Sequence, residues 1–179
     1  MEKIDKILIN AKDIKNRVAQ MGALIQTDYA EKSPVVICVL KGAMVFYSDL
    51  VRQIDLPLIF DTISVSSYGA GTSSSGKINI IKDLDCDISG KDVIVVEDII
   101  DSGLTMKTLT LTLKNRGAKS VKVCAFLDKP SGRRVDFKAD YVGYQIGDEF
   151  VVGYGLDFDG KYRNLPYIGA ISLDEGERE

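Results

Sequence analysis

The sequence predicts one α/β domain built on a mainly parallel, twisted sheet with helices on both faces. Continuous apolar runs, Val93–Val96 and Val35–Leu40, lack the polar alternation of half-exposed strands, which is typical of strands buried on both faces of a parallel sheet. These runs alternate with segments of helical periodicity, which indicates strand–helix–strand crossovers. At 179 residues the chain is long enough for one substantial core.

The first half of the chain supplies three of the expected strands and two helices, separated by a break at Ser33-Pro34. The expected strands are Ile7–Ile9, Val35–Leu40 and Leu58–Ser66. The expected helices run from the candidate cap Asn10 to about Tyr29 and over about Ala43–Gln53.

The second half holds one ambiguous element. Thr108–Leu113 alternates like a strand, but Met106, Leu109 and Leu113 also share one helical face, with Gly117 as a cap. We predict a helix, because a strand directly after the preceding turn would leave no crossover. The remaining expected strands are Val93–Val96, Val121–Leu127, Tyr141–Gln145 and Phe150–Val152.

A glycine- and serine-rich stretch, Tyr68–Gly76, connects the third strand to the strand-like Lys77–Lys82. Gly71–Lys77 matches the first part of a Walker A motif, but Ile78 replaces the hydroxyl residue and no helix follows, so we reject a nucleotide triphosphatase. The stretch is either a mobile lid or a plain hairpin loop. We expect Asp174–Glu179 to be a solvated acidic tail.

Composition narrows the possible functions. A net charge of −3 argues against an extensive nucleic-acid surface, and no apolar stretch approaches the about 20 residues of a membrane span. We therefore expect a cytoplasmic protein without nucleic-acid or membrane partners. The chain has no histidine, which excludes Ser-His-Asp and Cys-His catalysis and restricts any metal to oxygen ligands. Cys38 and Cys124 lie in apolar runs, so we expect both cysteines to be small, buried hydrophobic residues.

The segment Lys91–Leu113 carries the strongest functional signal. Two acids, Glu97 and Asp98, follow a buried strand, where α/β sheets bind ligands. The turn Asp101–Thr105 then opens a helix, and free amides at a helix start bind anions. A phosphate beside three carboxylates suits a sugar phosphate with a bound metal. A strand end, a capped turn and solvated acids remain the alternative interpretation.

These residues also carry a family resemblance. Val93–Thr108 resembles the 5-phosphoribosyl-1-pyrophosphate (PRPP) signature of type I phosphoribosyltransferases, in which an apolar strand and two acids precede Asp-Ser/Thr-Gly-x-Thr. Further segments resemble the members of this family that act on 6-oxopurines, in order and spacing. These segments are Leu40-Lys41-Gly42, Ser67-Tyr68, Lys129-Pro130 and Glu149–Asp157 through Arg163.

The resemblance implies the type I phosphoribosyltransferase fold over residues 1–179. The core would span about residues 30–150, and a small hood would be built from the N-terminal segment and about residues 151–179. The implied reaction is Mg²⁺-dependent transfer of the 5-phosphoribosyl group from PRPP to N9 of hypoxanthine or guanine, giving IMP or GMP and pyrophosphate. A xanthine-preferring enzyme and a PRPP-sensing regulator of the same fold remain alternatives. The resemblance also implies a homo-oligomer, either a dimer or a tetramer.

The resemblance assigns a role to each matching residue. Asp101 would be the general base, with helix capping as its alternative. The residues expected to bind PRPP and its 5′-phosphate are Glu97, Asp98, Asp101, Ser102, Gly103, Leu104 and Thr105. Those expected to bind pyrophosphate are Leu40, Lys41, Gly42 and Arg163, and Ser67 and Tyr68 belong to the expected lid. Those expected at the purine are Lys129, Phe150, Val151 and Asp157, and those at Mg²⁺ are Glu97, Asp98 and Asp157.

Overall fold

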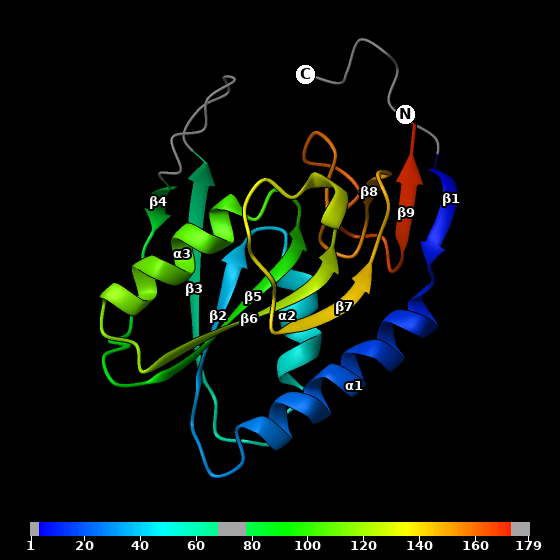
Figure 1. Cartoon of the computed structure of the whole chain (residues 1–179). Helices are drawn as coiled ribbons and strands as arrows, with labels where there is room; N and C mark the ends of the chain where they lie inside the picture. Colours follow the sequence, from blue (N-terminus) through cyan, green and yellow to red (C-terminus); the bar gives the residue numbers. More distant parts are fainter. Residues whose placement is uncertain (1–3, 68–77, 173–179) are drawn as a thin grey trace.

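The computed structural model describes residues 4–67 and 78–172, and its larger sheet has the strand order β4-β3-β2-β5-β6-β7 (Figure 1). Neighbouring strands in this sheet are parallel except for β3 and β4, which are antiparallel. The predicted mainly parallel α/β sheet is therefore confirmed. The strand bounds are Ile78–Lys82 (β4), Ile59–Ser67 (β3), Val35–Leu40 (β2), Asp92–Ile100 (β5), Ser120–Asp128 (β6) and Tyr141–Gln145 (β7).

Helices cover both faces of this sheet. In Figure 1, α1 (Ala11–Asp28) and α2 (Met44–Val51) lie on one face, and α3 (Leu104–Asn115) lies on the other. Alternate residues of the central strands enter the two layers, as Val36 and Ile94 do on one side and Val35 and Val93 on the other. Both environments are apolar, which explains the continuous apolar runs in the sequence.

The strand β5 is longer than the sequence indicated. We predicted an end at Val96, but the strand continues to Ile100 and includes both acids. Its last residues pair with the end of β6, where Ile100 lies opposite Asp128. Pairing with β6 satisfies the backbone hydrogen-bonding groups of these residues whatever their side chains are. The change from apolar to polar side chains therefore predicted the end of the strand too early.

The helix predicted after the turn Asp101–Thr105 is confirmed. α3 begins at Leu104, and the buried face contains Met106, Leu109 and Leu113. The alternating Thr-Leu pattern therefore reflects a helix whose threonines lie on its other sides. Packing of the leucines against the sheet outweighs the β-propensity of the threonines.

The N-terminal elements agree with the prediction, with shifted bounds. Asn10 caps α1, because its side-chain oxygen accepts a hydrogen bond from the amide of Asp13 at 3.0 Å. The first strand is longer than expected and spans Ile4–Ile9 (β1), whereas α2 is shorter at both ends. Cys38 and Cys124 are buried free thiols, as predicted.

A second, three-stranded sheet joins the two ends of the chain in the order β1-β9-β8. β8 (Phe150–Val152) and β9 (Ile168–Ile171) are antiparallel, and β1 pairs with the other edge of β9. Figure 1 shows this small sheet beside the upper ends of β6 and β7, toward which the parallel strands point. The segment between β8 and β9 therefore lies near the carboxyl edge of the large sheet.

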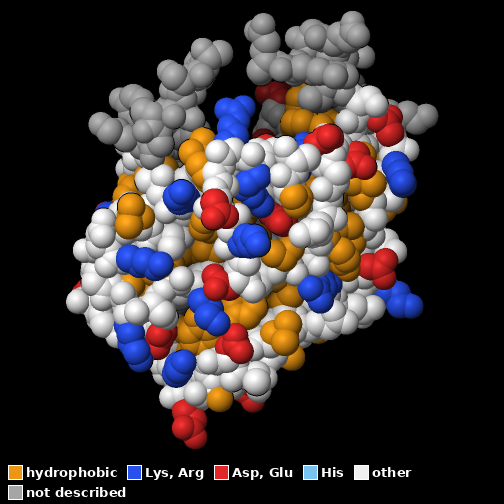
Figure 2. All heavy atoms as spheres, viewed as in Figure 1, with side chains coloured by type: hydrophobic (Ala, Val, Ile, Leu, Met, Phe, Trp, Pro, Cys, Tyr) orange, Lys and Arg blue, Asp and Glu red, His pale blue; other side chains and the backbone are white. Residues whose placement is uncertain are grey.

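Several expectations concern other parts of the chain or its surface. Tyr68–Gly76, its Walker A-like match and the acidic tail lie outside the described residues. Within residues 4–67 and 78–172, no helix is long and apolar enough to cross a membrane. On the face shown in Figure 2, basic and acidic side chains are interspersed.

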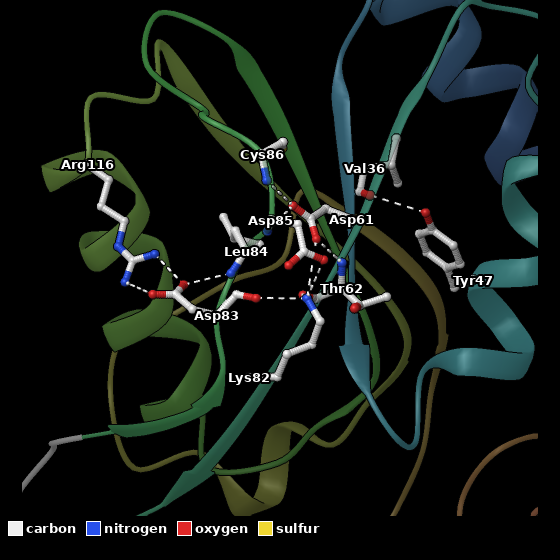
Figure 3. Close-up of polar contacts among 10 residues, drawn as sticks. All are labelled: Val36, Tyr47, Asp61, Thr62, Lys82, Asp83, Leu84, Asp85, Cys86 and Arg116. Atoms are coloured by element: carbon white, nitrogen blue, oxygen red, sulfur yellow. Dashed lines mark hydrogen bonds and ion pairs between the residues drawn. The ribbon is translucent and has the colours of Figure 1, made fainter.

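A buried carboxylate attaches the β4–β5 connection to β3 (Figure 3). Asp61 is 6% exposed, and its Oδ2 accepts hydrogen bonds from the amides of Asp85 and Cys86, both at 2.9 Å. Its Oδ1 accepts from the amide of Thr62 at 2.7 Å and lies 3.6 Å from Lys82 Nζ. Burial acts to raise the pKa of Asp61, but the amide donors outweigh it and hold the pKa below its ordinary value.

We predict that Asp61→Asn lowers the free energy of unfolding by about 1–3 kcal/mol at pH 7, because an amide cannot accept all of these donors. The pKa of Asp61 is lower in the folded than in the unfolded chain, so its stabilisation is lost as pH falls through the folded pKa. Urea unfolding at several pH values should therefore show that the difference in unfolding free energy between the variant and the wild type narrows below about pH 4. The exposed Asp136→Asn is the control, and a difference independent of pH would contradict the prediction.

Candidate active site

The carboxyl ends of β2, β5 and β6 lie side by side and carry most of the predicted site residues. β2 leads into Lys41 and Gly42, β5 into Asp101, and β6 into Lys129. The segment between β8 and β9 contributes Arg163. Parallel strands release their following loops at one edge, so residues that are far apart in sequence gather there.

The turn after β5 exposes backbone amides. Gly103 has φ 78°, a left-handed conformation that glycine adopts without strain, and it forms the N-cap of α3. The first intrahelical hydrogen bond runs from the amide of Lys107 to the carbonyl of Gly103 at 2.9 Å. The amides of Thr105 and Met106 therefore have no intrahelical acceptor, and with the helix dipole they favour an anion.

The two acids of β5 are desolvated. Burial raises the pKa of Glu97 well above its usual range, and the neighbouring Asp98 raises it further. Burial also raises the pKa of Asp98, while the amide of Ile99, which donates at 2.7 Å, and the guanidinium of Arg163 act in the opposite direction. Glu97 Oε2 is buried and has no hydrogen-bond partner within the described part of the chain. An unsatisfied buried oxygen beside a second carboxyl suits a hydroxyl or a hard cation.

The loop after β2 contacts these acids through backbone. The peptide bond between Leu40 and Lys41 is cis. A Cβ added to Gly42 would overlap the carboxylate of Asp98, so glycine allows this close approach. Gly155 similarly lies against the carbonyl of Gly42. Lys41 itself is exposed at the rim.

Arg163 faces the same loop from the small-sheet side. It forms an ion pair with Asp157 at 2.6 Å and donates to the carbonyl of Gly155 at 2.7 Å. The structure therefore brings together Gly42, Asp98 and Arg163, three of the predicted site residues. A guanidinium held in this way can exchange a protein acceptor for phosphate oxygens.

Three of the predicted purine-binding residues, Lys129, Phe150 and Val151, lie directly after β6 or in β8, whereas the fourth, Asp157, pairs with Arg163. Lys129 Nζ donates to the carbonyl of Asp148 at 3.1 Å, which ties the end of β6 to the start of β8. Phe150 is 41% exposed and lies edge-on to Phe158 with ring centroids 5.6 Å apart. Its side chain is therefore not a core residue, whereas Val151 is buried.

Gly132 and Arg133, which no pattern in the sequence singled out, contact the turn after β5. Gly132 lies against the carboxylate of Asp101, where a Cβ would overlap it. Arg133 donates to the backbone carbonyl of Asp101 at 2.6 Å and also pairs with Asp128. The adjacent Lys129-Pro130 was the only signal in the sequence near this segment.

Two further predictions concern the lid residues and the magnesium ligands. Ser67 ends β3, but its side chain and Tyr68 lie outside the description. Among the described residues, no three histidine, cysteine or acidic side chains form a ready-made metal site. A magnesium ion here would need ligand oxygens from substrate as well, which is its usual preference.

The site therefore combines a turn with free amides and two buried carboxyl groups at the carboxyl edge of a mainly parallel sheet. Residues 6–159 match the family model described as "Phosphoribosyl transferase domain". The chain therefore belongs to the phosphoribosyltransferase family. Within that family it is an enzyme of the hypoxanthine-guanine type, as two sets of relatives indicate.

The first set consists of curated proteins. The chain is 51% identical over 168 residues to the hypoxanthine-guanine phosphoribosyltransferase of Bacillus subtilis, with 94% of this chain and 93% of the relative covered. The second consists of solved structures. A hypoxanthine phosphoribosyltransferase from Staphylococcus aureus has a TM-score of 0.92 at 46% identity, with 94% and 92% covered. A hypoxanthine-guanine phosphoribosyltransferase from Bacillus anthracis also has a TM-score of 0.92 at 47% identity, with 95% and 100% covered.

We predict that Gly42→Ala reduces turnover by about 10- to 100-fold, because the new methyl group displaces Asp98 or the Lys41 loop. The measurement is kcat/KM for the transferase reaction. Gly90→Ala is the control: its φ of +69° makes alanine strained, but nothing lies within 4 Å. The control should lose about 1 kcal/mol of stability and keep its turnover. Normal turnover in Gly42→Ala would show that the close contact is dispensable.

Proposed function

We propose that the protein transfers the 5-phosphoribosyl group from PRPP to N9 of hypoxanthine or guanine, in a Mg²⁺-dependent reaction that yields IMP or GMP and pyrophosphate. The observation that carries this proposal is the anion-binding turn between two groups of predicted ligands. In the strand order β2-β5-β6 the turn after β5 follows the central strand, with the β2 loop beside one edge and Lys129 directly after the other neighbour, β6. Arg163 reaches the β2 loop through Gly155, and Lys129 donates to the carbonyl of Asp148 just before β8. A phosphorylated sugar in the turn would present C1 between a leaving diphosphate and an incoming base.

The 5′-phosphate is held by the turn. Asp101, Ser102, Gly103, Leu104 and Thr105 supply amides and hydroxyls at the N-terminus of α3, where the helix dipole favours negative charge. Leu104 already has its amide near the hydroxyl of Ser102, at 3.4 Å, a weak contact that an anion can replace.

The diphosphate is held on the β2 side. Lys41, exposed after the cis peptide with Leu40, and Arg163 supply positive charge, and the amide of Gly42 lies beside them. Charge builds on the diphosphate as the C1–oxygen bond breaks, so cations that strengthen their contacts in the transition state accelerate the step.

The acids hold the ribose and the metal. Glu97 and Asp98 would face the ribose hydroxyls, and Glu97, Asp98 and Asp157 would each offer oxygens to Mg²⁺ together with oxygens of the substrate, because no three acidic side chains come together among the described residues. The fit rests on the unsatisfied, buried oxygen of Glu97. When bound, Mg²⁺ neutralises charge on the diphosphate.

Asp101 acts as the general base that accepts the proton from N7 of the purine. Its side chain is exposed at the mouth of the turn, and the contact with Gly132 directs it. Because the chain lacks histidine, a carboxylate is the available group for this transfer.

The base lies against β8. Lys129 donates to the 6-oxo group, Phe150 stacks on the ring, and the backbone of Val151 and the carboxylate of Asp157 complete the site. A lysine cannot donate usefully to a 6-amino group, which selects against adenine. Ser67 and Tyr68 belong to the lid that excludes water, and the small sheet acts as the hood of a single domain.

A xanthine-preferring enzyme is the second candidate, because Lys129 recognises any 6-oxopurine. The regulator considered from the sequence is set aside, since the chain is an enzyme. The deciding experiment is to incubate the protein with PRPP, Mg²⁺ and hypoxanthine, guanine, xanthine or adenine in turn, and to measure nucleotide formation. Turnover of hypoxanthine or guanine above xanthine supports the proposal, whereas no turnover with any base refutes it.

We further propose a cytoplasmic homo-oligomer. A relative from Trypanosoma cruzi, 38% identical with a TM-score of 0.91, was studied for the effect of its C-terminal region on oligomeric state. Met44 and Phe60 on this chain are large, exposed hydrophobic residues that association would cover.

We predict that Asp101→Asn lowers kcat by about 100-fold or more while PRPP binding persists, because the amide keeps the shape of the side chain but cannot accept the proton. Steady-state kinetics and PRPP titration together test this. The exposed Asp136→Asn should behave as wild type. Unchanged turnover in Asp101→Asn would remove Asp101 from the role of general base, and Gly103 rather than Asp101 already forms the N-cap of α3.

We predict that Lys129→Gln weakens the preference for 6-oxopurines over adenine by about tenfold or more, because a neutral amide can both donate and accept at the purine edge. The measurement is the ratio of kcat/KM for hypoxanthine and adenine. Lys138→Gln, an exposed lysine on the following loop, is the matched control. A ratio equal to that of wild type would remove Lys129 from base recognition.

A further inference from the structure

Three consecutive carbonyl oxygens where β5 leads into the turn Asp101–Thr105, those of residues 100–102, accept hydrogen bonds from the segment 129–134. The donors are, in order, the amide of Lys129 (2.9 Å), the guanidinium of Arg133 (2.6 Å) and the amide of Arg134 (3.0 Å). One segment therefore fixes the orientation of three successive peptide units.

This arrangement determines where the amides point. In a trans peptide the carbonyl and the following N–H lie on opposite sides, so a donor on the carbonyl of Asp101 directs the N–H of Ser102 away from Arg133. Neither Ser102 nor Gly103 donates its amide to any acceptor in the described part of the chain. A charged donor on the carbonyl also polarises the peptide, which strengthens its N–H as a donor.

Arg133 is itself held in place. Its other terminal nitrogen pairs with Asp128, and the two side chains are only 16% and 12% exposed. The aliphatic part of Arg133 contacts Gly103, 3.0 Å from where a Cβ would lie. Asp128, the partner of Arg133, is the last residue of β6. It directly precedes Lys129, the residue proposed to recognise the base.

We propose that Arg133, anchored by Asp128, is a positioning residue for phosphate binding. It holds the Asp101–Ser102 peptide so that the Ser102 amide faces the 5′-phosphate, and it adds positive charge one peptide unit behind the anion. This inference rests on the proposed function, because it assigns the 5′-phosphate to the turn. It predicts an effect on the sugar phosphate that the diphosphate does not share.

The test compares two anions that occupy different parts of the site. Arg133→Met keeps the bulk of the side chain and removes its donors. Isothermal titration calorimetry should show ribose 5-phosphate binding at least about tenfold more weakly, with pyrophosphate changed by less than about twofold. Arg133→Lys should fall between wild type and Arg133→Met, because one ammonium cannot reproduce the forked contact with both acceptors.

The matched control is Arg116→Met. Arg116 forms an equivalent pair with Asp83 at 2.5 Å but lies at the opposite end of α3 (Figure 3). It should leave both affinities within about twofold of wild type, since its pair is remote from the turn. Circular dichroism and the Tm report folding.

If folded Arg133→Met binds both anions more weakly by the same factor, or binds both as tightly as wild type, the positioning role is overturned. If Arg133→Met does not fold, Arg133→Lys decides by the same comparison. A wild-type protein that shows no turnover refutes the proposed function instead. Normal wild-type turnover with unaltered ribose 5-phosphate affinity in the variant refutes only the role of Arg133.

Discussion

Burial of β5 on both faces is the constraint on which the site depends. The run Val93–Val96 is fully buried between β2 and β6, with a helical layer on each side. Polar side chains are costly anywhere along this run, so the first acids occur where the strand approaches the edge of the sheet. The parallel neighbours end at the same edge, and their following loops carry Lys41 and Lys129 to it.

Close backbone contacts then set the positions of the carboxylates. Gly42 allows Asp98 to lie against the β2 loop, and Gly132 does the same for Asp101. Gly155 in turn lies against the carbonyl of Gly42. In each case a side chain would occupy the space that a functional group or its supporting loop requires. The geometry of the site therefore depends on the lack of a side chain at these glycines as much as on the acids.

Charged groups of both signs are concentrated at this edge of the sheet. Desolvation raises the pKa values of Glu97 and Asp98. Glu97 Oε2 has no hydrogen-bond partner in the described part of the chain, whereas Asp98 accepts from the amide of Ile99. The arginines are already paired, Arg163 with Asp157 and Arg133 with Asp128. Cations that are already held in place need little reorganisation to meet a negative charge.

The sequence by itself determined the mainly parallel α/β sheet, the turn that opens α3 and the family, because continuous apolar runs and short backbone motifs are local signals. It did not reveal the extension of β5 to Ile100, because pairing with β6 satisfies that backbone whatever its polarity. Only the tertiary structure decided that Arg133, 32 residues away, contacts the carbonyl of Asp101. Such contacts arise from how β5 and β6 pack side by side, and no local pattern of residues records them.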